Sequence, residues 1–407
     1  MAAGGERAQG FRRIGFLDLP GGGQVVVAGR HAYVGHMAPP HGTSIIDVSE
    51  PASPRLVSQV TVPGDVHSHK VRVLDDLMLV NYERFPPGDA TKTPATGLKI
   101  FDVSDRSHPR EVTFFRTHGR GVHRFDLQGH TAFISTEWEG FRSNILLILD
   151  LSNPLRPSVV GQWWLPGQHA AGGEEPPNDL RHYWVHLALA RGDRVYAACG
   201  RAGAWIVDIS DPHHPAALGG ATWNPPYALP AHTFLPLARP IGSRRFAVVA
   251  DEDVTDDVLE EPPAFMWVLD ITSETHPVPV ATYHVDPAGL AVPGRRFGAH
   301  QPWERIRDDN MVFLAWFSGG VRAVDVSNPY APREAGYYVP SAPEGESVPQ
   351  TNDIFVDDRG LVYAVDRYRG LSILEFIPNT GGSVGRAHSA AAPRGRRPEP
   401  GAEPARR

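Results

Sequence analysis

One sequence motif returns seven times along this chain. Each copy is a short apolar stretch that ends in an acidic residue and leads, in most copies through Val-Ser or Ile-Ser, into a proline-containing turn. The acidic residues are Asp47, Asp102, Asp150, Asp208, Asp270, Asp325 and Glu375. They recur every 48 to 62 positions, which is the length of a structural repeat and too short for a domain. With β-branched stretches and Gly, Pro and Asn turns between the copies, this period predicts a β-propeller.

Each period has room for four short strands. In the second copy we expect them at residues 69–74, 77–82, 97–103 and 110–115. The seventh copy contains only three, and the segment that starts at Arg12 resembles the outermost strands of the other copies. We therefore predict an all-β fold, a seven-bladed β-propeller of four-stranded antiparallel blades, closed by the N-terminal strand pairing into the last blade.

The repeats leave no room for a second domain. We expect a disordered N-terminus at residues 1–11, one propeller at residues 12–377 and a disordered C-terminal tail at residues 378–407. The tail is rich in Pro, Gly, Ala and Arg, and it contains too little apolar surface to offset the entropic cost of ordering.

Charge and composition exclude several classes of partner. A net charge of −7 disfavours nucleic acid, which needs a clustered basic face. No Gly-rich loop precedes a helix, so no nucleotide cofactor is expected. The chain has no apolar run long enough to span a bilayer and no signal sequence at its start, so we expect no membrane partner and a cytoplasmic location. Cys199 is the only cysteine, which precludes an intrachain disulfide.

The pattern of apolar strand, Asp, Val-Ser and proline turn resembles the LVIVD repeat family of predicted seven-bladed propellers. The resemblance covers nearly all of residues 12–377, although the chain lacks the signal sequence of secreted members. It implies the architecture and little about function, because that family is defined by a structural repeat and a fold alone does not set the chemistry.

Histidine recurs where the innermost strand of each blade begins. The aligned positions are His69, His123, His186, His232 and His300, and a sixth position holds Asn352. Because equivalent positions of a propeller converge on its axis, we expect these side chains to meet at one mouth of the ring.

Carboxylates recur at a fixed distance from this set. Glu83, Glu137 and Asp366 each follow one of the aligned positions by fourteen residues, where the second strand should return to the same rim. Imidazoles bind divalent transition metals, and carboxylates bind the metal or orient the imidazoles. The five His therefore predict a metal site, with Fe or Cu favoured and Zn or Mn also suitable, and Glu83, Glu137, Asp366 and Asn352 are its candidate catalytic residues. The alternative is a polar plug of His, Glu and trapped water. The repeated Asp residues stand singly before turns, so we assign them to turn amides and not to calcium.

The long loops lie on the same face and carry aromatic and basic residues. We expect the following side chains to bind substrate: Trp138, Trp184, Tyr227, Trp303, Trp316, Phe317, Arg84 and Arg367. Aromatic walls suit an apolar small molecule, and arginines suit a carboxylate or phosphate.

Three functional hypotheses follow. The first is a metal-dependent small-molecule enzyme, an oxidoreductase such as an oxygenase with a redox-active ion, or a lyase with a Lewis-acid ion. The second is a metal-free cyclase or isomerase of a hydrophobic, specialised metabolite that uses His and Glu as acid and base. The third is a non-catalytic interaction scaffold. The sequence does not name the substrate or the oligomeric state.

Overall fold

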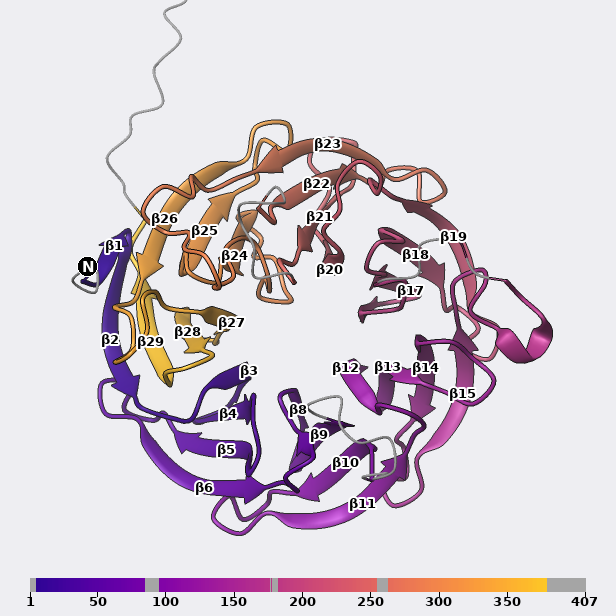
Figure 1. Ribbon diagram of the computed structural model, residues 1–407, viewed down its shortest axis with the longest axis horizontal. Helices are drawn as coiled ribbons and strands as arrows, with labels where there is room; N and C mark the ends of the chain where they lie inside the picture. Colours follow the sequence, from indigo (N-terminus) through magenta and orange to yellow (C-terminus); the bar gives the residue numbers. More distant parts are fainter. Residues whose placement is uncertain (1–4, 85–94, 176, 178–181, 255–262, 379–407) are drawn as a thin grey trace, which may run out of the picture.

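The computed structural model describes residues 5–84, 95–175, 177, 182–254 and 263–378. Their strands form seven antiparallel sheets arranged in a ring around a central axis (Figure 1). The only helix in these ranges is the short 3-10 turn η1 (Ala170–Gly172), and none of them holds a helix with the length and apolarity needed to cross a membrane. The predicted seven-bladed propeller of four-stranded antiparallel blades is confirmed.

The first four blades are built from consecutive strands between Gly22 and Ala221. Blade 1 contains β3 (Gly22–Ala28), β4 (His31–His36), β5 (His41–Asp47) and β6 (Arg55–Thr61). Blade 2 contains β7 (Val66–His67) and β8 (Val71–Leu74), which both pair with β9 (Leu77–Arg84), then β10 (Gly97–Asp102) and β11 (Arg110–Arg116). Blade 3 contains β12 (Val122–Gln128), β13 (Thr131–Glu137), β14 (Asn144–Asp150) and β15 (Ser158–Trp163). Blade 4 contains β16 (Leu187–Arg191), β17 (Arg194–Ala198), β18 (Ala204–Asp208) and β19 (Ala216–Ala221).

Blade 5 is also built from consecutive strands, and the last two blades each add one N-terminal strand. Blade 5 contains β20 (Ala231–Pro236), β21 (Phe246–Asp251), β22 (Met266–Asp270) and β23 (Val278–Tyr283). Blade 6 contains β24 (Met311–Ala315), β25 (Val321–Asp325), β26 (Arg333–Val339) and, outermost, β1 (Arg7–Gln9). Blade 7 contains β27 (Thr351–Val356), β28 (Leu361–Asp366), β29 (Leu371–Phe376) and β2 (Phe11–Leu17).

The ring closes through the N-terminal segment. Strand β2 pairs with β29 from Phe11–Phe376 to Leu17–Leu371, as predicted, which covers an otherwise open sheet edge. The expectation of disorder over residues 1–11 was wrong for Arg7–Gln9, because these residues form β1 and add to the outside of β26. The expected C-terminal tail lies almost entirely outside the described residues.

The repeated acidic residue terminates the third strand of a blade by accepting a turn hydrogen bond. In six copies its Oδ1 accepts the backbone N–H two residues later at 2.8 to 2.9 Å, and the first of these pairs is Asp47 with Ser49. These bonds with Ser49 lower the pKa of Asp47 to about 2. The assignment of the repeated Asp to turns is confirmed.

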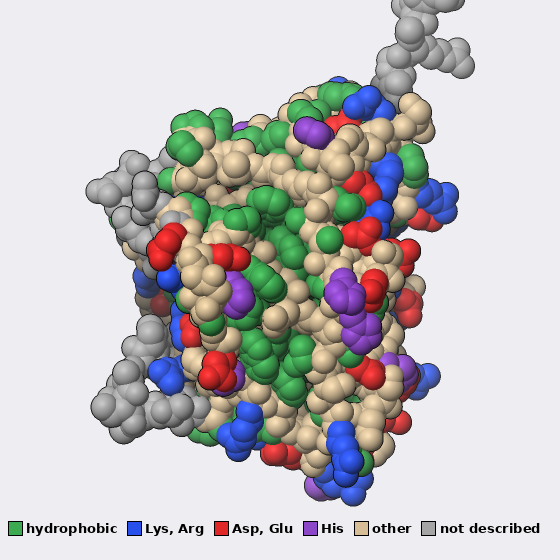
Figure 2. Space-filling model, turned by 90° about the vertical axis from the view of Figure 1, so that its right-hand side faces the viewer, with side chains coloured by type: hydrophobic (Ala, Val, Ile, Leu, Met, Phe, Trp, Pro, Cys, Tyr) green, Lys and Arg blue, Asp and Glu red, His purple; other side chains and the backbone are tan. Residues whose placement is uncertain are grey.

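Apolar side chains fill the spaces between neighbouring blades. Strands β13, β14, β16 and β17, for example, contribute Phe133, Ile148, Ala188 and Val195 to one apolar cluster that joins blades 3 and 4. The side view in Figure 2 shows apolar side chains gathered along the middle of the wall and charged ones toward its edges. This packing holds the innermost strands at equal angles around the axis, and so positions the residues described next.

Candidate metal centre

Four innermost strands carry a β-bulge at the same place. The pairing of β12 with β13 passes from Val122–Thr136 to Arg124–Ser135 and skips His123. Blades 1, 5 and 7 skip the equivalent residues, Gly23, His232 and Asn352. A bulge interrupts the alternation of side chains, so that two successive residues can face the axis.

The five predicted histidines lie next to one another in an arc around the axis, which we call the histidine arc. Ring centroids are 5.5 Å apart from His69 to His123 and 4.8 Å from His123 to His186. The arc continues at 4.3 Å to His232 and 4.2 Å to His300. The structure therefore brings together, from five blades, side chains that are far apart in the sequence.

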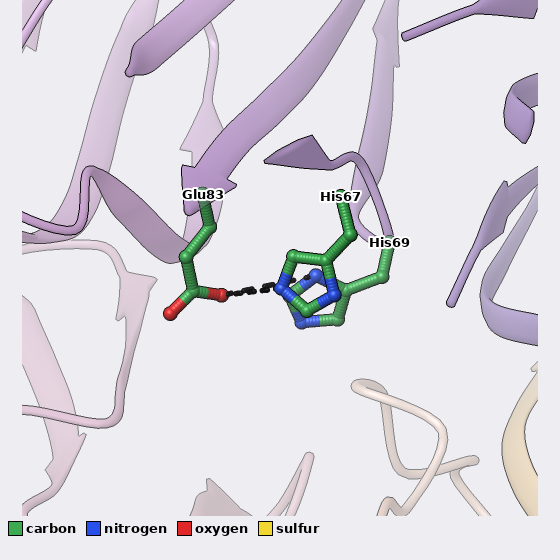
Figure 3. Close-up of side chains that lie close together, drawn as sticks. All are labelled: His67, His69 and Glu83. Carbon is green, nitrogen blue, oxygen red and sulfur yellow. Dashed lines mark hydrogen bonds and ion pairs between the residues drawn. The ribbon is translucent and has the colours of Figure 1, made fainter. Parts of the chain in front are cut away.

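A sixth histidine, His67, belongs to the same group and was missed in the sequence analysis. Its ring lies over that of His69, with centroids 4.1 Å apart, and its Nε2 lies 2.8 Å from Glu83 Oε2 (Figure 3). The sequence does carry a signal for it, because positions two apart in an extended chain share a face. Because only one histidine was assigned to each blade, His67 was overlooked.

Glu83 is the acidic centre of this side of the arc. Its side chain is 4% exposed, and it accepts hydrogen bonds from His67 at 2.8 Å and from His123 Nδ1 at 3.0 Å. Burial opposes its ionisation, but the charges and hydrogen bonds of His123 and His67 outweigh burial and lower the pKa of Glu83 well below its usual value. Glu83 is therefore an ionised acceptor.

Three histidines of the arc have the same hydrogen-bonding pattern. Nδ1 of His123 faces Glu83, Nδ1 of His186 lies 2.9 Å from the carbonyl oxygen of His232, and Nδ1 of His300 lies 2.5 Å from that of Asn352. All three partners are acceptors, so Nδ1 carries the proton in each case. The lone pair of each neutral ring is then on Nε2, which is the arrangement found in metal-binding histidines.

Two of these lone pairs face each other, because Nε2 of His123 lies 3.0 Å from Nε2 of His186. The Glu252 carboxylate lies between two of the rings, 3.9 Å from Nε2 of His186 and 3.6 Å from Nε2 of His300. Burial lowers the pKa of His186 and of His300 well below the usual value, so both rings are neutral and able to bind a cation. His186, His232 and Glu252 form one group with metal-binding spacing, and His67, His69 and Glu83 form another.

The other two histidines of the arc are engaged differently. His232 lies 2.7 Å from the Thr233 hydroxyl through Nδ1 and 2.7 Å from Arg124 through Nε2, so both of its nitrogens already have protein partners. Nδ1 of His69 accepts from the Asn81 amide at 3.2 Å, which places its proton on Nε2. The predicted metal-binding set of five is thus chemically divided, with His123, His186 and His300 best placed to bind an ion.

A pocket opens beside the convergent nitrogens. It has a volume of about 240 Å³, and it is lined by both arc residues and rim residues, among them His123, His186, Glu252, Arg120 and Trp184. Two further lining residues, Ser143 and His182, have left-handed backbone angles, with φ of 59° and 58°. Strain of this kind in side-chain-bearing residues is concentrated at functional sites.

Other predicted site residues lie close to the arc in different roles. Phe317 packs on the His300 ring with centroids 4.5 Å apart, and the Arg367 guanidinium lies over Phe317 at 5.0 Å. Arg367 also donates to the side-chain oxygen of Asn352 at 2.6 Å.

Glu137 lines the pocket and accepts the Arg120 backbone N–H at 3.0 Å. Arg84 ends β9 and is joined to Arg120 through its backbone.

The structure places three of the predicted site residues, Asp366, Trp303 and Trp316, away from the arc. Asp366 does not contact the arc, because it accepts the backbone N–H groups of the turn that follows it and that of Gln350. Trp303 lies at the opposite end of the axis, in a pocket with Arg72 and Glu304. Trp316 is a fully buried core residue.

Two more predicted aromatic residues are engaged in packing. Trp138 stacks on Phe115 with centroids 6.3 Å apart, and Tyr227 packs edge-on against Phe265 and Trp267. Neither lines the pocket beside the arc.

The sheets and their order define the chain as a seven-bladed β-propeller with a polar, histidine-rich axis. The family model of the LVIVD repeat matches residues 22–62, 95–117, 140–163, 189–220 and 309–339. The chain therefore carries LVIVD repeats, and the resemblance inferred from the motif is confirmed.

Solved structures share the fold at low sequence identity. The WD40 β-propeller domain of Doa1 superposes with a TM-score of 0.57 at 9% identity, over 90% of this chain and 97% of that chain. A chain from an S. cerevisiae complex of Dbp5 with Nup159, Gle1, IP6 and ADP gives 0.54 at 14% identity, over 89% and 94%. The computationally designed Ika8 protein gives 0.50 at 8% identity, over 89% and 98%. Identities this low show the fold alone, and no curated protein matches the chain.

Proposed function

We propose that this protein is a metal-dependent enzyme that acts on a small molecule. The ion would be held by Nε2 of His123, His186 and His300 and by the Glu252 carboxylate. Fe or Cu is our first choice, since imidazole with carboxylate suits redox-active ions, and Zn or Mn also fits this set. When bound, the ion would supply Lewis-acid or redox chemistry beside the pocket.

The contact between His123 and His186 carries the proposal. Both rings have their proton on Nδ1, so two lone pairs face each other at 3.0 Å unless a cation lies between them. Metal–imidazole bonds of about 2.0–2.1 Å place two ligating nitrogens on one ion roughly 2.9–3.4 Å apart. The observed separation lies in that range. The buried, neutral state of His186 disfavours the other cation, a shared proton.

The surroundings support a small-molecule substrate. The adjoining pocket of about 240 Å³ is below the usual size of drug-binding sites, which suits a compact ligand. Trp184 supplies an aromatic wall, and Arg120 supplies a cation at the rim, 3.4 Å from Glu83. Both groups are positioned to fix the orientation of a ligand without occupying the convergent nitrogens.

A metal-free acid–base enzyme is the second candidate, and Glu83 favours it. One carboxylate joins two imidazoles, His67 and His123, which is the kind of chain that holds and moves a proton. In that case the gap between His123 and His186 would hold a proton.

Metal content separates the two candidates. Untagged protein purified without chelators should contain about one equivalent of a transition metal, and His186→Asn should lose it. His214→Asn is the matched control, because that exposed ring pairs with Asp211 on the opposite face. Metal far below one equivalent in the untreated protein, and no uptake of added Co²⁺, Cu²⁺ or Fe²⁺, would refute the metal proposal. Unchanged ligand binding in both His186→Asn and His123→Asn would point instead to a scaffold.

A further inference from the structure

A second layer of polar side chains lies directly beneath the histidine arc. It consists of the residues that immediately follow four of the arc histidines and the two equivalent positions Gly23 and Asn352. These residues are Gln24, Lys70, Arg124, Thr233, Gln301 and Asp353. The bulges described above turn four of these side chains, Gln24, Arg124, Thr233 and Asp353, toward the axis together with their neighbours. All six are buried, and nothing in the repeat motif requires them to be polar.

Lys70 lies on the axis under the arc. It is 2% exposed, and charges from several other blades act on it, among them Arg124, Asp353 and Glu252. Burial is the main cause of the lowered pKa of every arc histidine, and the Lys70 charge contributes to that lowering in all five. Only a position close to the axis brings one ammonium near residues of five blades.

Lys70 and Arg124 have no carboxylate partner in the described part of the chain. The Lys70 ammonium forms no hydrogen bond or ion pair there, and burial lowers the pKa of this group well below its usual value. Arg124 donates to Gln301 at 2.7 Å and to His232 at 2.7 Å, both neutral groups, and its Nε has no partner. By contrast, Arg72 lies farther along the axis and has both Glu304 at 2.5 Å and Asp126 at 3.7 Å.

We propose that Lys70 and Arg124 form a binding site for a small monovalent anion of halide size on the propeller axis. An anion would supply the negative charge that both side chains lack, and a single small ion is the simplest ligand that two buried cations of neighbouring blades can share. Asp353, whose Oδ2 has no partner among the described residues, is the only acidic member of this layer, and it lies more than an ion-pair distance from Lys70. The site requires no metal in the arc above it, so it stands or falls independently of the proposed function.

Bromide tests this directly because it scatters anomalously. Crystals grown in about 100 mM NaBr should show an anomalous peak beside Lys70 Nζ, and Lys70→Met crystals should lack it. In solution, bromide should raise the melting temperature of the wild type by about 2 °C or more relative to gluconate at equal ionic strength. Lys70→Met should lose this response, and Lys99→Met, which removes a lysine paired with Glu111 in blade 2, should keep it.

Two results would overturn the proposal of an anion site. A wild-type crystal with no bromide peak at Lys70, in which ordered water fills the space, would overturn the proposal even if Lys70→Met failed to fold. An equal bromide response in the wild type and Lys70→Met would do the same. Both measurements are made on metal-free protein, so a missing metal site cannot produce either outcome.

Discussion

Replacing Glu83 by Gln is the sharpest test of how the arc is organised. The Glu83 carboxylate accepts from His67 at 2.8 Å and from His123 at 3.0 Å, and it is almost fully buried. Both carboxylate oxygens lie close to His123 Nδ1, at 3.0 and 3.1 Å, so in either orientation Gln places its N–H₂ donor against that N–H. The proton is then no longer held on Nδ1 of His123, and Nε2 is no longer reserved for an ion.

The size of the effect follows from this geometry. Loss of a carboxylate that orients a metal-binding imidazole typically weakens metal binding 10- to 100-fold, about 1.4–2.7 kcal/mol. Hydrogen bonds to a charged group contribute about 1.5–3 kcal/mol each, so the free energy of unfolding should fall by a similar amount. We expect both changes in Glu83→Gln.

Glu137→Gln provides the control. Glu137 ends the equivalent strand of the next blade, but it accepts only a backbone N–H from Arg120. Affinity for Co²⁺, measured by competition with a chromophoric chelator, should fall in Glu83→Gln and stay near the wild-type value in Glu137→Gln. A Co²⁺ affinity and absorption spectrum of Glu83→Gln identical to those of the wild type would refute the reasoning.

Three further predictions concern pH, the pocket and ring closure. Burial raises the pKa of Asp366 to about 6, so its contribution to stability, roughly 3 kcal/mol, is complete below about pH 4 and is lost as the pH rises through 6. Urea unfolding between pH 4 and 7.5 should therefore show a fall in stability that is smaller in Asp366→Asn than in the wild type, where buried Asp353, with a pKa of about 7, adds a fall of its own. Trp184→Leu should weaken small-molecule binding in the arc pocket at least several-fold by calorimetry, and Trp303→Leu, at the other end of the axis, should leave it unchanged. Deletion of residues 1–18 removes β2 and exposes the edge of β29, so this variant should aggregate, as measured by size-exclusion chromatography. Deletion of residues 1–10 removes only β1, so this variant should elute as a folded monomer and have a lower melting temperature than the wild type.

The sequence by itself determined the ring and the histidine arc. Turn chemistry and strand patterning are local, so each Asp-Val-Ser copy predicts its own blade, and the three-stranded last copy predicts closure by the segment after Arg12. The arc was predictable because the blades are related by rotation, and equal positions in a repeat then meet at one axis. His69 and His300 needed no further information than their alignment.

Only the tertiary structure decided the hydrogen-bond partners, tautomers and directions of these side chains. The bulge at His123 brings Arg124 to the axis, and a count along the strand would have placed it on the other face. His232 and His186 occupy equivalent positions, yet Nε2 of His232 contacts Arg124 and Nε2 of His186 faces His123, because their partners come from neighbouring blades. Glu252 was not assigned to the site, since the hairpin before it is longer than in the other blades. Contacts between blades do not repeat regularly along the sequence, and these contacts determine the tautomer, charge and direction of each side chain.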